Sequence, residues 1–255
     1  MLSLILVLSV LSPAAADDEG LSRLFAREAA NGTLVISSLD GATTFVHDSI
    51  RANTRFSPAS TFKILNSLIV LEEGAISGLD EVLVWDGRHR DVQDWNRDHT
   101  LGSAFKASCV WCYQELARRV GAPKYRERVD EAAYGVLKEP FAGTSFWLDG
   151  SLTISAAEQV EFLRKVVRRS LPYRESTYDS LRQIMVVEQT PDYTIRAKTG
   201  WAASVTPQVG WYVGYVEKQD ATWIFALNVD IASDRELPLR QRLVRVSLQD
   251  KGIIE

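Results

Sequence analysis

Strand-like segments at both ends of the chain constrain the fold more than any other feature. The late segments cover residues 194–198, 208–217 and 222–230, and the early ones cover residues 33–38 and 43–47. Aromatic and β-branched residues dominate the late segments, as half-buried sheet positions require. The turn residues Asp40-Gly41 and Lys218-Gln219-Asp220 predict hairpins within the two groups. We therefore expect one antiparallel sheet built from both chain ends.

Helical patterns occupy most of the sequence between these segments. Ser57-Pro58 predicts the start of a strong helix, with the serine as cap and the proline in the first turn. Ser155 and Glu158 predict a capping box, and residues 21–30 and 240–250 predict helices near the two ends. The expected fold class is α/β in a layered α+β arrangement, with helices flanking the sheet. The sheet region takes about residues 17–60 and 190–255, and the inserted, mostly helical region takes about residues 61–189.

The first sixteen residues predict a secretory signal peptide. An apolar run from Leu2 to Leu11 precedes Ser12-Pro13-Ala14-Ala15-Ala16, and small residues are typical of a cleavage site. The run is shorter than the roughly 20 residues that span a bilayer. We expect residues 17–255 to form a single domain, periplasmic or secreted and without a membrane anchor after cleavage. A buried N-terminal strand is the alternative. No Lys or Arg precedes the run, which leaves open whether the true start lies upstream of Met1.

Composition excludes several classes of function. Apolar residues make up 46% and charged residues 24%, which is ordinary for a globular protein. The net charge of −4 argues against a nucleic-acid partner. His47, His89 and His99 form no metal-ligand run with the two cysteines, so no metal is expected. These histidines are also expected to be non-catalytic, because no G-x-S-x-G motif accompanies them.

Cys109 and Cys112 stand at C-x-x-C spacing in a helical context. A thioredoxin-like redox motif would follow a strand, which is missing here. An oxidising compartment would allow a disulfide between them. Two buried thiols are the favoured expectation.

Ser60-Thr61-Phe62-Lys63 supplies the first candidate for chemistry. Residues three apart are neighbours on a helix, so the Lys63 nitrogen can reach the Ser60 oxygen. Ser60 would also lie in the first helical turn, where free N–H groups favour an anion. A hydroxyl with an adjacent base is the minimum for acyl transfer. Alone this S-x-x-K motif is weak, because Ser103 to Lys106 repeats it with no other sign of a site.

Lys198-Thr199-Gly200 is a rarer combination, and it lies at the end of a predicted strand. Lysine and threonine on an exposed edge suit a substrate carboxylate. A strand N–H group can also stabilise an oxyanion. Taken alone, the segment could equally be a strand that ends in a turn.

The order of these motifs resembles that of the penicillin-recognising serine enzymes, and in particular of the class D (oxacillinase-type) β-lactamases. The matching segments are Phe56–Lys63, Ser108–Val110, Phe146–Gly150, Lys198–Trp201, Gly210–Glu217 and Leu239–Gln241. The resemblance extends from about Ser57 to Arg240. It implies the fold shared by β-lactamases and transpeptidases, and hydrolysis of the β-lactam amide of penicillin-type antibiotics.

The resemblance also implies roles for the groups that do chemistry. Ser60 would attack the β-lactam carbonyl, and Lys63 would act as general base after carboxylation by CO2 to N6-carboxylysine. That modification needs a neutral amine, which burial favours. Trp147 would donate a hydrogen bond to the carbamate, and Ser108 would pass a proton to the leaving nitrogen. No cofactor is expected beyond CO2 or bicarbonate.

Further residues are implied to bind the substrate. Val110 would help to keep the site dry, and the N–H groups of Ser60 and Trp201 would form the oxyanion hole. Lys198, Thr199 and Arg240 would hold the substrate carboxylate, and Gly200 completes their motif. Trp147 as core packing and Arg240 as a surface arginine are the plainer alternatives.

One segment departs from the family pattern. Tyr134-Gly135-Val136 stands where the family usually has Tyr-Gly-Asn, and valine cannot make the hydrogen bonds of asparagine. The departure concerns local loop geometry and substrate preference.

Two other functions share these motifs. A β-lactam sensor domain acylates without turnover, but such domains are normally tethered behind membrane helices, and no suitable apolar stretch follows residue 16. A cell-wall transpeptidase or carboxypeptidase is disfavoured by Val110, where asparagine is usual. The expected partner is a small β-lactam, and the protein is expected to be a monomer or a homodimer.

Overall fold

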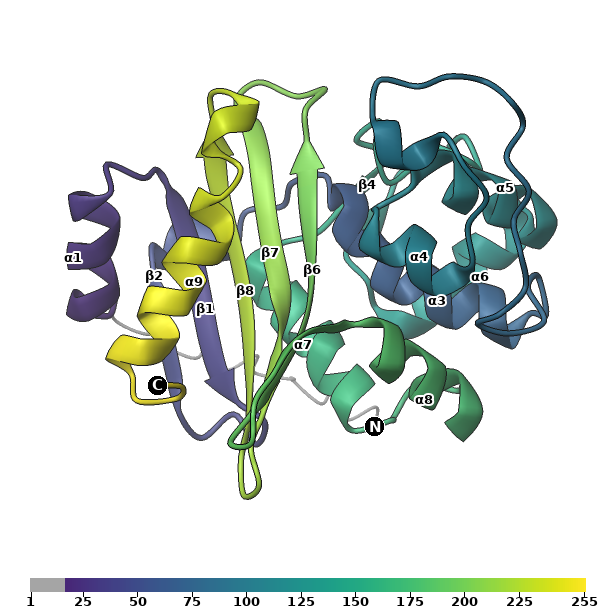
Figure 1. The fold of residues 1–255 in the computed structure, drawn as a ribbon. Coiled ribbons are helices and arrows are strands. Elements are labelled where there is room, and N and C mark those ends of the chain that lie inside the picture. Colours follow the sequence, from purple (N-terminus) through teal and green to yellow (C-terminus); the bar gives the residue numbers. More distant parts are fainter. Residues whose placement is uncertain (1–16) are drawn as a thin grey trace, which may run out of the picture.

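The computed structural model describes residues 17–255, so the predicted signal peptide lies outside the described residues. A six-stranded antiparallel sheet forms its centre, in the order β2-β1-β8-β7-β6-β5 (Figure 1). The early hairpin therefore joins the late strands through the pairing of β1 with β8, as expected. The strands are β1 Gly32–Ser38, β2 Thr44–His47, β5 Val186–Gln189, β6 Thr194–Ala202, β7 Gln208–Glu217 and β8 Thr222–Ile231, and a separate small pair is β3 Val136–Leu137 with β4 Leu152–Thr153.

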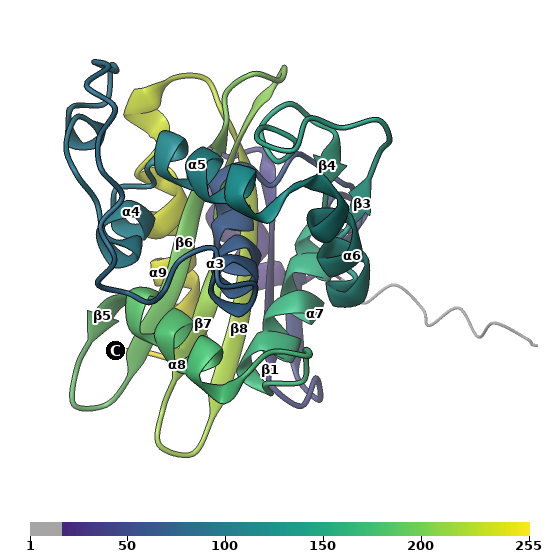
Figure 2. The same ribbon diagram turned by 90° about the vertical axis from the view of Figure 1, so that its right-hand side faces the viewer.

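Helices cover both faces of the sheet. They are α1 Glu19–Arg27, α2 Ser49–Ala52, α3 Lys63–Glu72, α4 Leu101–Lys106, α5 Val110–Val120, α6 Ala122–Ala132, α7 Ala156–Val167, α8 Glu175–Ile184 and α9 Leu239–Asp250. Short 3-10 segments are η1 Ala59–Phe62, η2 Gln93–Trp95 and η3 Asp234–Glu236. Helices α1 and α9 lie on one face, and α3 to α8 lie on the other (Figures 1 and 2). No helix of the described residues is long and apolar enough to cross a membrane.

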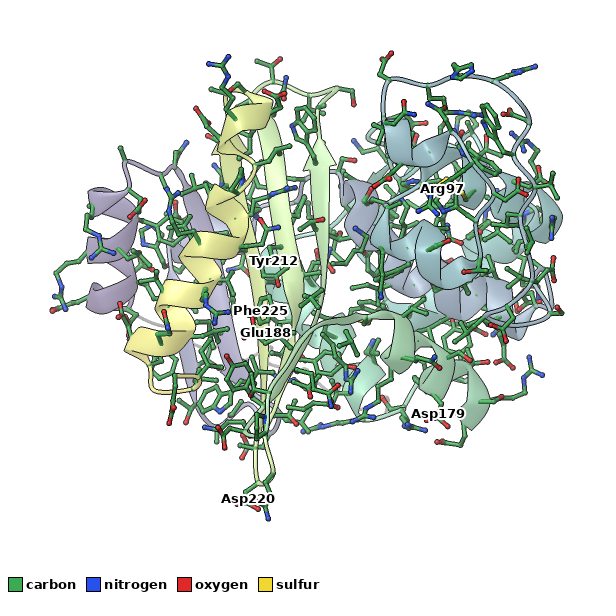
Figure 3. All side chains as sticks on the ribbon, viewed as in Figure 1. Arg97, Asp179, Glu188, Tyr212, Asp220 and Phe225 are labelled. Carbon is green, nitrogen blue, oxygen red and sulfur yellow. A yellow bond between two sulfur atoms is a disulfide. The ribbon has the colours of Figure 1, made fainter. Side chains whose placement is uncertain are left out.

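Alternating side chains of the strands supply two separate cores. Tyr212 and Phe225 face α9 (Figure 3), and Val213 and Ile224 face the helical region. This alternation is the two-residue period of a strand with both faces covered. Strand β5 belongs to the sheet although its residues fall in the segment 61–189 that was expected to be mostly helical.

The predicted helix at Ser57-Pro58 begins differently from the expectation. The chain first forms η1 and enters the α-helix at Lys63. Ser57 does not cap this helix, because its hydroxyl donates to the Trp147 carbonyl oxygen at 3.0 Å. Ser57 is buried at the contact between two segments 90 residues apart, so the tertiary partner displaces the local cap. The capping box of Ser155 and Glu158 forms as predicted.

Strand β6 extends beyond its predicted end at Lys198. Lys198, Thr199 and Gly200 pair with Val213, Tyr212 and Trp211 of β7, and the strand ends at Ala202. The K-T-G segment therefore lies within a strand and does not end one. Pairing with β7 determines this length, because the local sequence is ambiguous: Thr199 and Trp201 favour a strand, whereas Gly200 and Ala202 do not.

Candidate active site

Ser60 and Lys63 meet at the junction of η1 and α3. Residues i and i+3 eclipse one another in a 3-10 turn, and the Lys63 Nζ donates to the Ser60 Oγ at 2.9 Å. Ala59, directly before Ser60, has a positive φ of 47°. A residue other than glycine adopts this conformation only where its surroundings enforce it. The predicted nucleophile and its neighbouring amine are therefore in contact.

Burial makes the Lys63 amine a base. Lys63 is fully buried, and this burial, with the positive charge of Lys198 as a smaller cause, holds its pKa well below the ordinary value. The amine lies 5.1 Å from the centre of the Tyr113 ring. Among the described residues no carboxylate lowers the cost of a charge on Lys63. The neutral amine, which can accept a proton, is thus favoured.

Trp147 is buried with an unsatisfied donor. Its indole stacks on Phe62, with ring centres 5.6 Å apart, and its Nε1 has no hydrogen-bond partner among the described residues. Buried N–H groups are nearly always paired, so an orphaned one needs a reason. Its backbone is tied to the entry of η1 by Ser57, whose carbonyl accepts from Trp211 Nε1 at 2.9 Å. Trp147 stays a predicted site residue, and its unpaired donor is the observation that bears on that prediction.

Strand β6 passes close to η1 at Gly200. A Cβ at this position would lie 3.0 Å from the Pro58 carbonyl oxygen and 3.1 Å from Thr61 Cγ2. The Ala197 N–H donates to the Met185 carbonyl oxygen and therefore points away from β7. Because N–H directions repeat every second residue, the Trp201 N–H points to this same edge. The Trp201 N–H is therefore directed away from β7, and its place in an oxyanion hole stays a prediction.

Lys198 and Arg240 form a buried cationic pair beside this edge. Burial, with the charge of Arg240 as the second cause, lowers the pKa of Lys198 to about 7. Burial also lowers the pKa of Arg240 to about 10. The Lys198 amine donates to the Thr199 carbonyl oxygen at 3.0 Å, and Arg240 Nη1 donates to the Gly200 carbonyl oxygen at 2.7 Å. In the part of the chain that the structure describes, neither cation is paired with a carboxylate, so the two together favour an anion nearby. Arg240 is not the surface arginine of the alternative interpretation.

Ser108 and Val110 lie where the chain passes from α4 into α5. Ser108 has a positive φ of 53°, and Val110 is the first residue of α5. Both side chains are half-buried. In the described part of the chain, no hydrogen bond joins the Ser108 hydroxyl to Ser60 or Lys63. The two serines are therefore not linked directly, and Ser108 stays a predicted participant.

The cysteines are joined in a disulfide, contrary to the expected free thiols. Cys109 caps α5 and Cys112 lies one turn later, which brings their Cα atoms to 5.5 Å, within the range that a disulfide needs. The disulfide that an oxidising compartment would allow is thus formed, and the expectation of two buried thiols is wrong. His99 lies beside them, with one ring nitrogen and the two sulfurs within 4.8 Å of one another. Bridged sulfurs are not thiolates, so this cluster lacks the ligands that zinc prefers.

Several residues of the site were missed by sequence reasoning. The Phe105 ring lies under the Lys198 amine, with its centre 5.6 Å from the nitrogen. The Tyr113 ring lies in the same way under the Lys63 amine. Phe105 and Tyr113 stand on either side of the Ser108–Val110 segment in the sequence, and this position is the signal that could have indicated them. The second S-x-x-K is structural, because the Ser103 hydroxyl accepts from Thr100 N–H at 3.0 Å in a capping box.

The valine at the departure from the family pattern faces outward. Val136 pairs with Thr153 in the small β3–β4 sheet and is 38% exposed. Gly135 has a φ of 66°, and a Cβ there would lie 2.1 Å from the Thr153 carbonyl oxygen, so this turn requires glycine. The buried Tyr134 hydroxyl accepts from Gln159 Nε2 at 3.1 Å. The turn is thus held by its tyrosine and glycine, without an asparagine.

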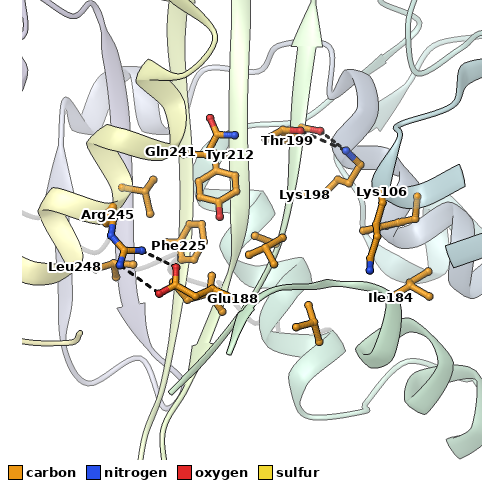
Figure 4. Close-up of a pocket in the computed structure, with 16 residues that line it drawn as sticks. Lys106, Ile184, Glu188, Lys198, Thr199, Tyr212, Phe225, Gln241, Arg245 and Leu248 are labelled. Carbon is orange, nitrogen blue, oxygen red and sulfur yellow. Dashed lines mark hydrogen bonds and ion pairs between the residues drawn. The ribbon is translucent and has the colours of Figure 1, made fainter. Parts of the chain in front are cut away.

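A cleft of about 600 Å³ adjoins the K-T-G segment from the side of α9 (Figure 4). Lys198 and Thr199 line one end, and Glu188, paired with Arg245 at 2.6 Å, lines the other. Tyr212 lies between them. Ser60 and Lys63 are not part of its lining, so the cleft borders the reacting groups and does not contain them.

Comparisons with known proteins agree with this geometry. The family model described as "Penicillin binding protein transpeptidase domain" matches residues 28–248. Beta-lactamase OXA-48 of Klebsiella pneumoniae is 41% identical over 232 residues, which cover 90% of this chain and 87% of that protein. Beta-lactamase OXA-10 of Pseudomonas aeruginosa is 36% identical over 233 residues, which cover 90% and 88%.

Solved structures of class D enzymes superpose closely. The class D beta-lactamase YbXI from Nostoc has a TM-score of 0.88 and 40% identity, and the match covers 91% of this chain and 98% of that one. FUS-1 (OXA-85) from Fusobacterium nucleatum subsp. polymorphum has a TM-score of 0.91 and 34% identity, covering 94% and 100%. With its motifs assembled around Ser60 and its fold shared with these enzymes, the chain belongs to the penicillin-binding transpeptidase family and, within it, to the class D beta-lactamases.

Proposed function

We propose that the protein hydrolyses the β-lactam amide of penicillin-type antibiotics through an acyl-enzyme on Ser60. The observation that carries the proposal is the contact of the Ser60 hydroxyl with the fully buried Lys63 amine at 2.9 Å. An amine kept neutral can take the hydroxyl proton as Ser60 attacks the carbonyl carbon. The names of the relatives, which are beta-lactamases, support this choice of substrate.

We propose that Lys63 works as its carbamate. The residues around it fit such a group, because the amine is favoured as neutral and the orphaned Trp147 Nε1 is a donor without an acceptor. When present, the carbamate supplies a general base for acylation and for activation of the hydrolytic water. Trp147 would hold it by the indole N–H, and the apolar side chain of Val110 would help to exclude bulk water.

The remaining groups orient the substrate and receive its developing charge. The Ser60 and Trp201 N–H groups stabilise the carbonyl oxygen as it becomes an anion, in the manner of an oxyanion hole. Lys198, Thr199 and Arg240 bind the substrate carboxylate. An anion there raises the lowered pKa of Lys198, because opposite charge favours the protonated amine. Ser108 transfers a proton to the leaving nitrogen as the amide bond breaks.

We propose that the protein acts in the periplasm or outside the cell, as a monomer or homodimer and without a metal. The signal-like sequence of residues 1–16 supports export. The Cys109–Cys112 disulfide supports it independently, because such bonds persist in oxidising compartments.

Intact-mass spectrometry with benzylpenicillin, sampled from seconds to hours, tests the function. We expect penicilloate to accumulate with a transient or absent adduct, and no product from Ser60→Ala. Ser103→Ala, which alters the serine of the second S-x-x-K, is the matched control and should retain turnover. A stoichiometric adduct on Ser60 that persists for hours would identify a sensor or a penicillin-binding protein. Neither adduct nor product would contradict the proposal altogether.

A further inference from the structure

A disulfide adjoins the residue to which the proposed mechanism assigns proton transfer to the leaving nitrogen. Cys109 and Cys112 are bonded across the first turn of α5, both fully buried, and Ser108 directly precedes them. We propose that this disulfide is a positioning element of the active site, which holds Ser108 in its left-handed conformation and thereby sets the rate of acylation. The inference rests on the proposed function of Ser108.

Ser108 needs such support because its backbone is unfavourable for a serine. At a φ of 53° the Cβ of an L-residue crowds the following carbonyl group. Such a conformation persists only where neighbouring structure over-determines it. On the α4 side, the Ser108 N–H donates to Phe105 O at 3.2 Å and the Cys109 N–H donates to Ala104 O at 2.9 Å. These bonds fix where the chain leaves α4.

The disulfide fixes where the chain enters α5. Cys109 is the residue that caps the helix, and its Sγ accepts from the Cys112 N–H at 3.3 Å. Sulfur is a weak acceptor, so this cap alone would hold the turn loosely. The covalent bond closes the same turn and ties Cys109 to the helix. The direction of the backbone on the far side of Ser108 is thereby fixed.

Two indoles hold the surrounding segment independently of the disulfide. Trp95 Nε1 donates to the Ala107 carbonyl oxygen at 2.9 Å, and Trp111 Nε1 donates to the Trp95 carbonyl oxygen at 2.7 Å. These contacts would survive loss of the sulfur–sulfur bond. A protein without the bond should therefore stay folded and loosen mainly around Ser108.

The bond can be removed chemically or by substitution. A dithiol such as dithiothreitol reduces the disulfide with two electrons and two protons to give two thiols, and closes to its own cyclic disulfide. The paired substitution C109S/C112A removes the bond without a reductant. This matters because the disulfide is buried, and a reductant reaches it only when the protein opens locally. Serine at position 109 keeps an N-cap acceptor. This variant therefore loses the covalent bond and retains the cap of α5.

The test compares acylation rates of four proteins with benzylpenicillin: the wild type, C109S/C112A, S108A, and the triple variant. We expect the bridge variant to acylate at least about ten-fold more slowly, since small misplacements of a catalytic group have effects of this size. In the S108A background, removing the bridge should cause no further loss, because both changes act through one group. Losses that multiply in the triple variant, or a wild-type rate in C109S/C112A, would overturn the inference.

A destabilised control separates positioning from general stability. Leu21→Ala creates a cavity in the other core, under α1, and should lower the melting temperature without slowing acylation. Hydrogen exchange gives a readout that needs no turnover. We expect faster exchange of residues 105–113 in C109S/C112A and unchanged exchange in α9. If the wild type formed neither adduct nor product, the proposed function would fail, while equal exchange in the two proteins would overturn the positioning role itself.

Discussion

Single buried polar groups carry most of the chemistry of this site. The Lys63 amine, the Trp147 indole and the Lys198 amine are each almost completely buried. Among the described residues the two amines have no carboxylate partner, and the indole N–H has no hydrogen-bond acceptor. Burying these groups costs stability, and this cost is explained if the substrate and the proposed carbamate supply the missing partners. Residues of this kind are the natural targets for substitution.

Trp147→Phe should lower kcat strongly while the protein remains folded. The variant removes the indole N–H, so the proposed carbamate on Lys63 would lose a hydrogen bond and form less readily. We expect kcat to fall at least about ten-fold, in the lower range of what a general base contributes, and to recover in part with added bicarbonate. The smaller ring leaves a cavity that costs about 1–3 kcal/mol of unfolding free energy.

Trp223→Phe is the matched control for this prediction, because Trp223 packs in the other core beside Phe45. Steady-state kinetics at several bicarbonate concentrations make the comparison. A Trp147→Phe enzyme with wild-type kcat in bicarbonate-free buffer would show that the indole has no part in catalysis.

Stability should rise with pH between about pH 7 and pH 9. The pKa of Lys198 is about 7 in the folded protein and near 10.5 when exposed, so the unfolded state binds more protons in this interval. The free energy of unfolding then increases by at most about 1.4 kcal/mol per pH unit for this lysine. Lys63, whose pKa is also lowered, contributes in the same direction in CO2-free buffer.

Urea unfolding of the wild type and of Lys198→Met across this interval measures the slope. The variant should show a shallower dependence on pH. Above about pH 10 the raised pKa of Tyr113 acts in the opposite direction, because the unfolded tyrosine ionises first. Parallel curves for the two proteins would contradict the assignment to Lys198.

At the scale of elements, the site depends on how closely β6 approaches η1. The predicted nucleophile Ser60 lies in η1, and β6 carries Lys198 and Thr199, which are predicted to bind the substrate carboxylate. Their separation is therefore set by the contact of β6 with η1. Gly200 permits the approach, since the Pro58 carbonyl oxygen and Thr61 occupy the space that a side chain would need.

Gly200→Ala should therefore impair catalysis more than stability. Its Cβ would lie 3.0 Å from the Pro58 oxygen and would push β6 away from Ser60. We expect kcat/KM to fall about ten- to a hundred-fold, as for displacements of several tenths of an ångström or more. Gly78→Ala, where no atom lies within 4 Å of the new Cβ, should leave kcat/KM unchanged. Equal kinetics for the two variants would show that the approach is not critical.

At the scale of the whole molecule, the sheet separates most of the predicted site from the terminal elements of the described residues. The helical region with Ser60 and Lys63 lies on one side, and α1, α9 with Arg240, and residues 253–254 pack on the other. The early hairpin and the late strands meet through β1 and β8, whose register joins Gly32 to Val229 and Ser38 to Trp223. Stability and catalysis can therefore be perturbed separately.

Replacing both Ile253 and Ile254 by alanine should destabilise the protein with little effect on catalysis. Both side chains are almost fully buried in the core that contains α1 and α9. Each such truncation costs about 2–5 kcal/mol, a large part of the stability of a typical domain. Urea unfolding with kcat/KM below the transition tests this. Glu255→Ala, at an exposed position, is the control, and a loss of kcat/KM in the folded double variant would contradict the separation.

The sequence by itself determined five of the six strands of the central sheet and the order of the motifs, and it predicted the residues of the catalytic set. It missed β5, which lies in the segment expected to be mostly helical. Aromatic and β-branched runs specify β7 and β8 locally, and the i,i+3 spacing of Ser60 and Lys63 brings their side chains together in any helical turn. The family resemblance supplied the roles of Trp147 and Arg240, which spacing could not reveal.

Only the tertiary structure decided the features that depend on distant partners. Ser57 bonds to Trp147 in place of capping a helix, and β6 extends through Gly200 because β7 pairs with it. The disulfide follows from the way in which Cys109 begins α5, and the lowered pKa values of Lys63 and Lys198 follow from burial. Local propensity carries no information about contacts made tens of residues away, and those contacts give the lysines and serines of this site their reactivity.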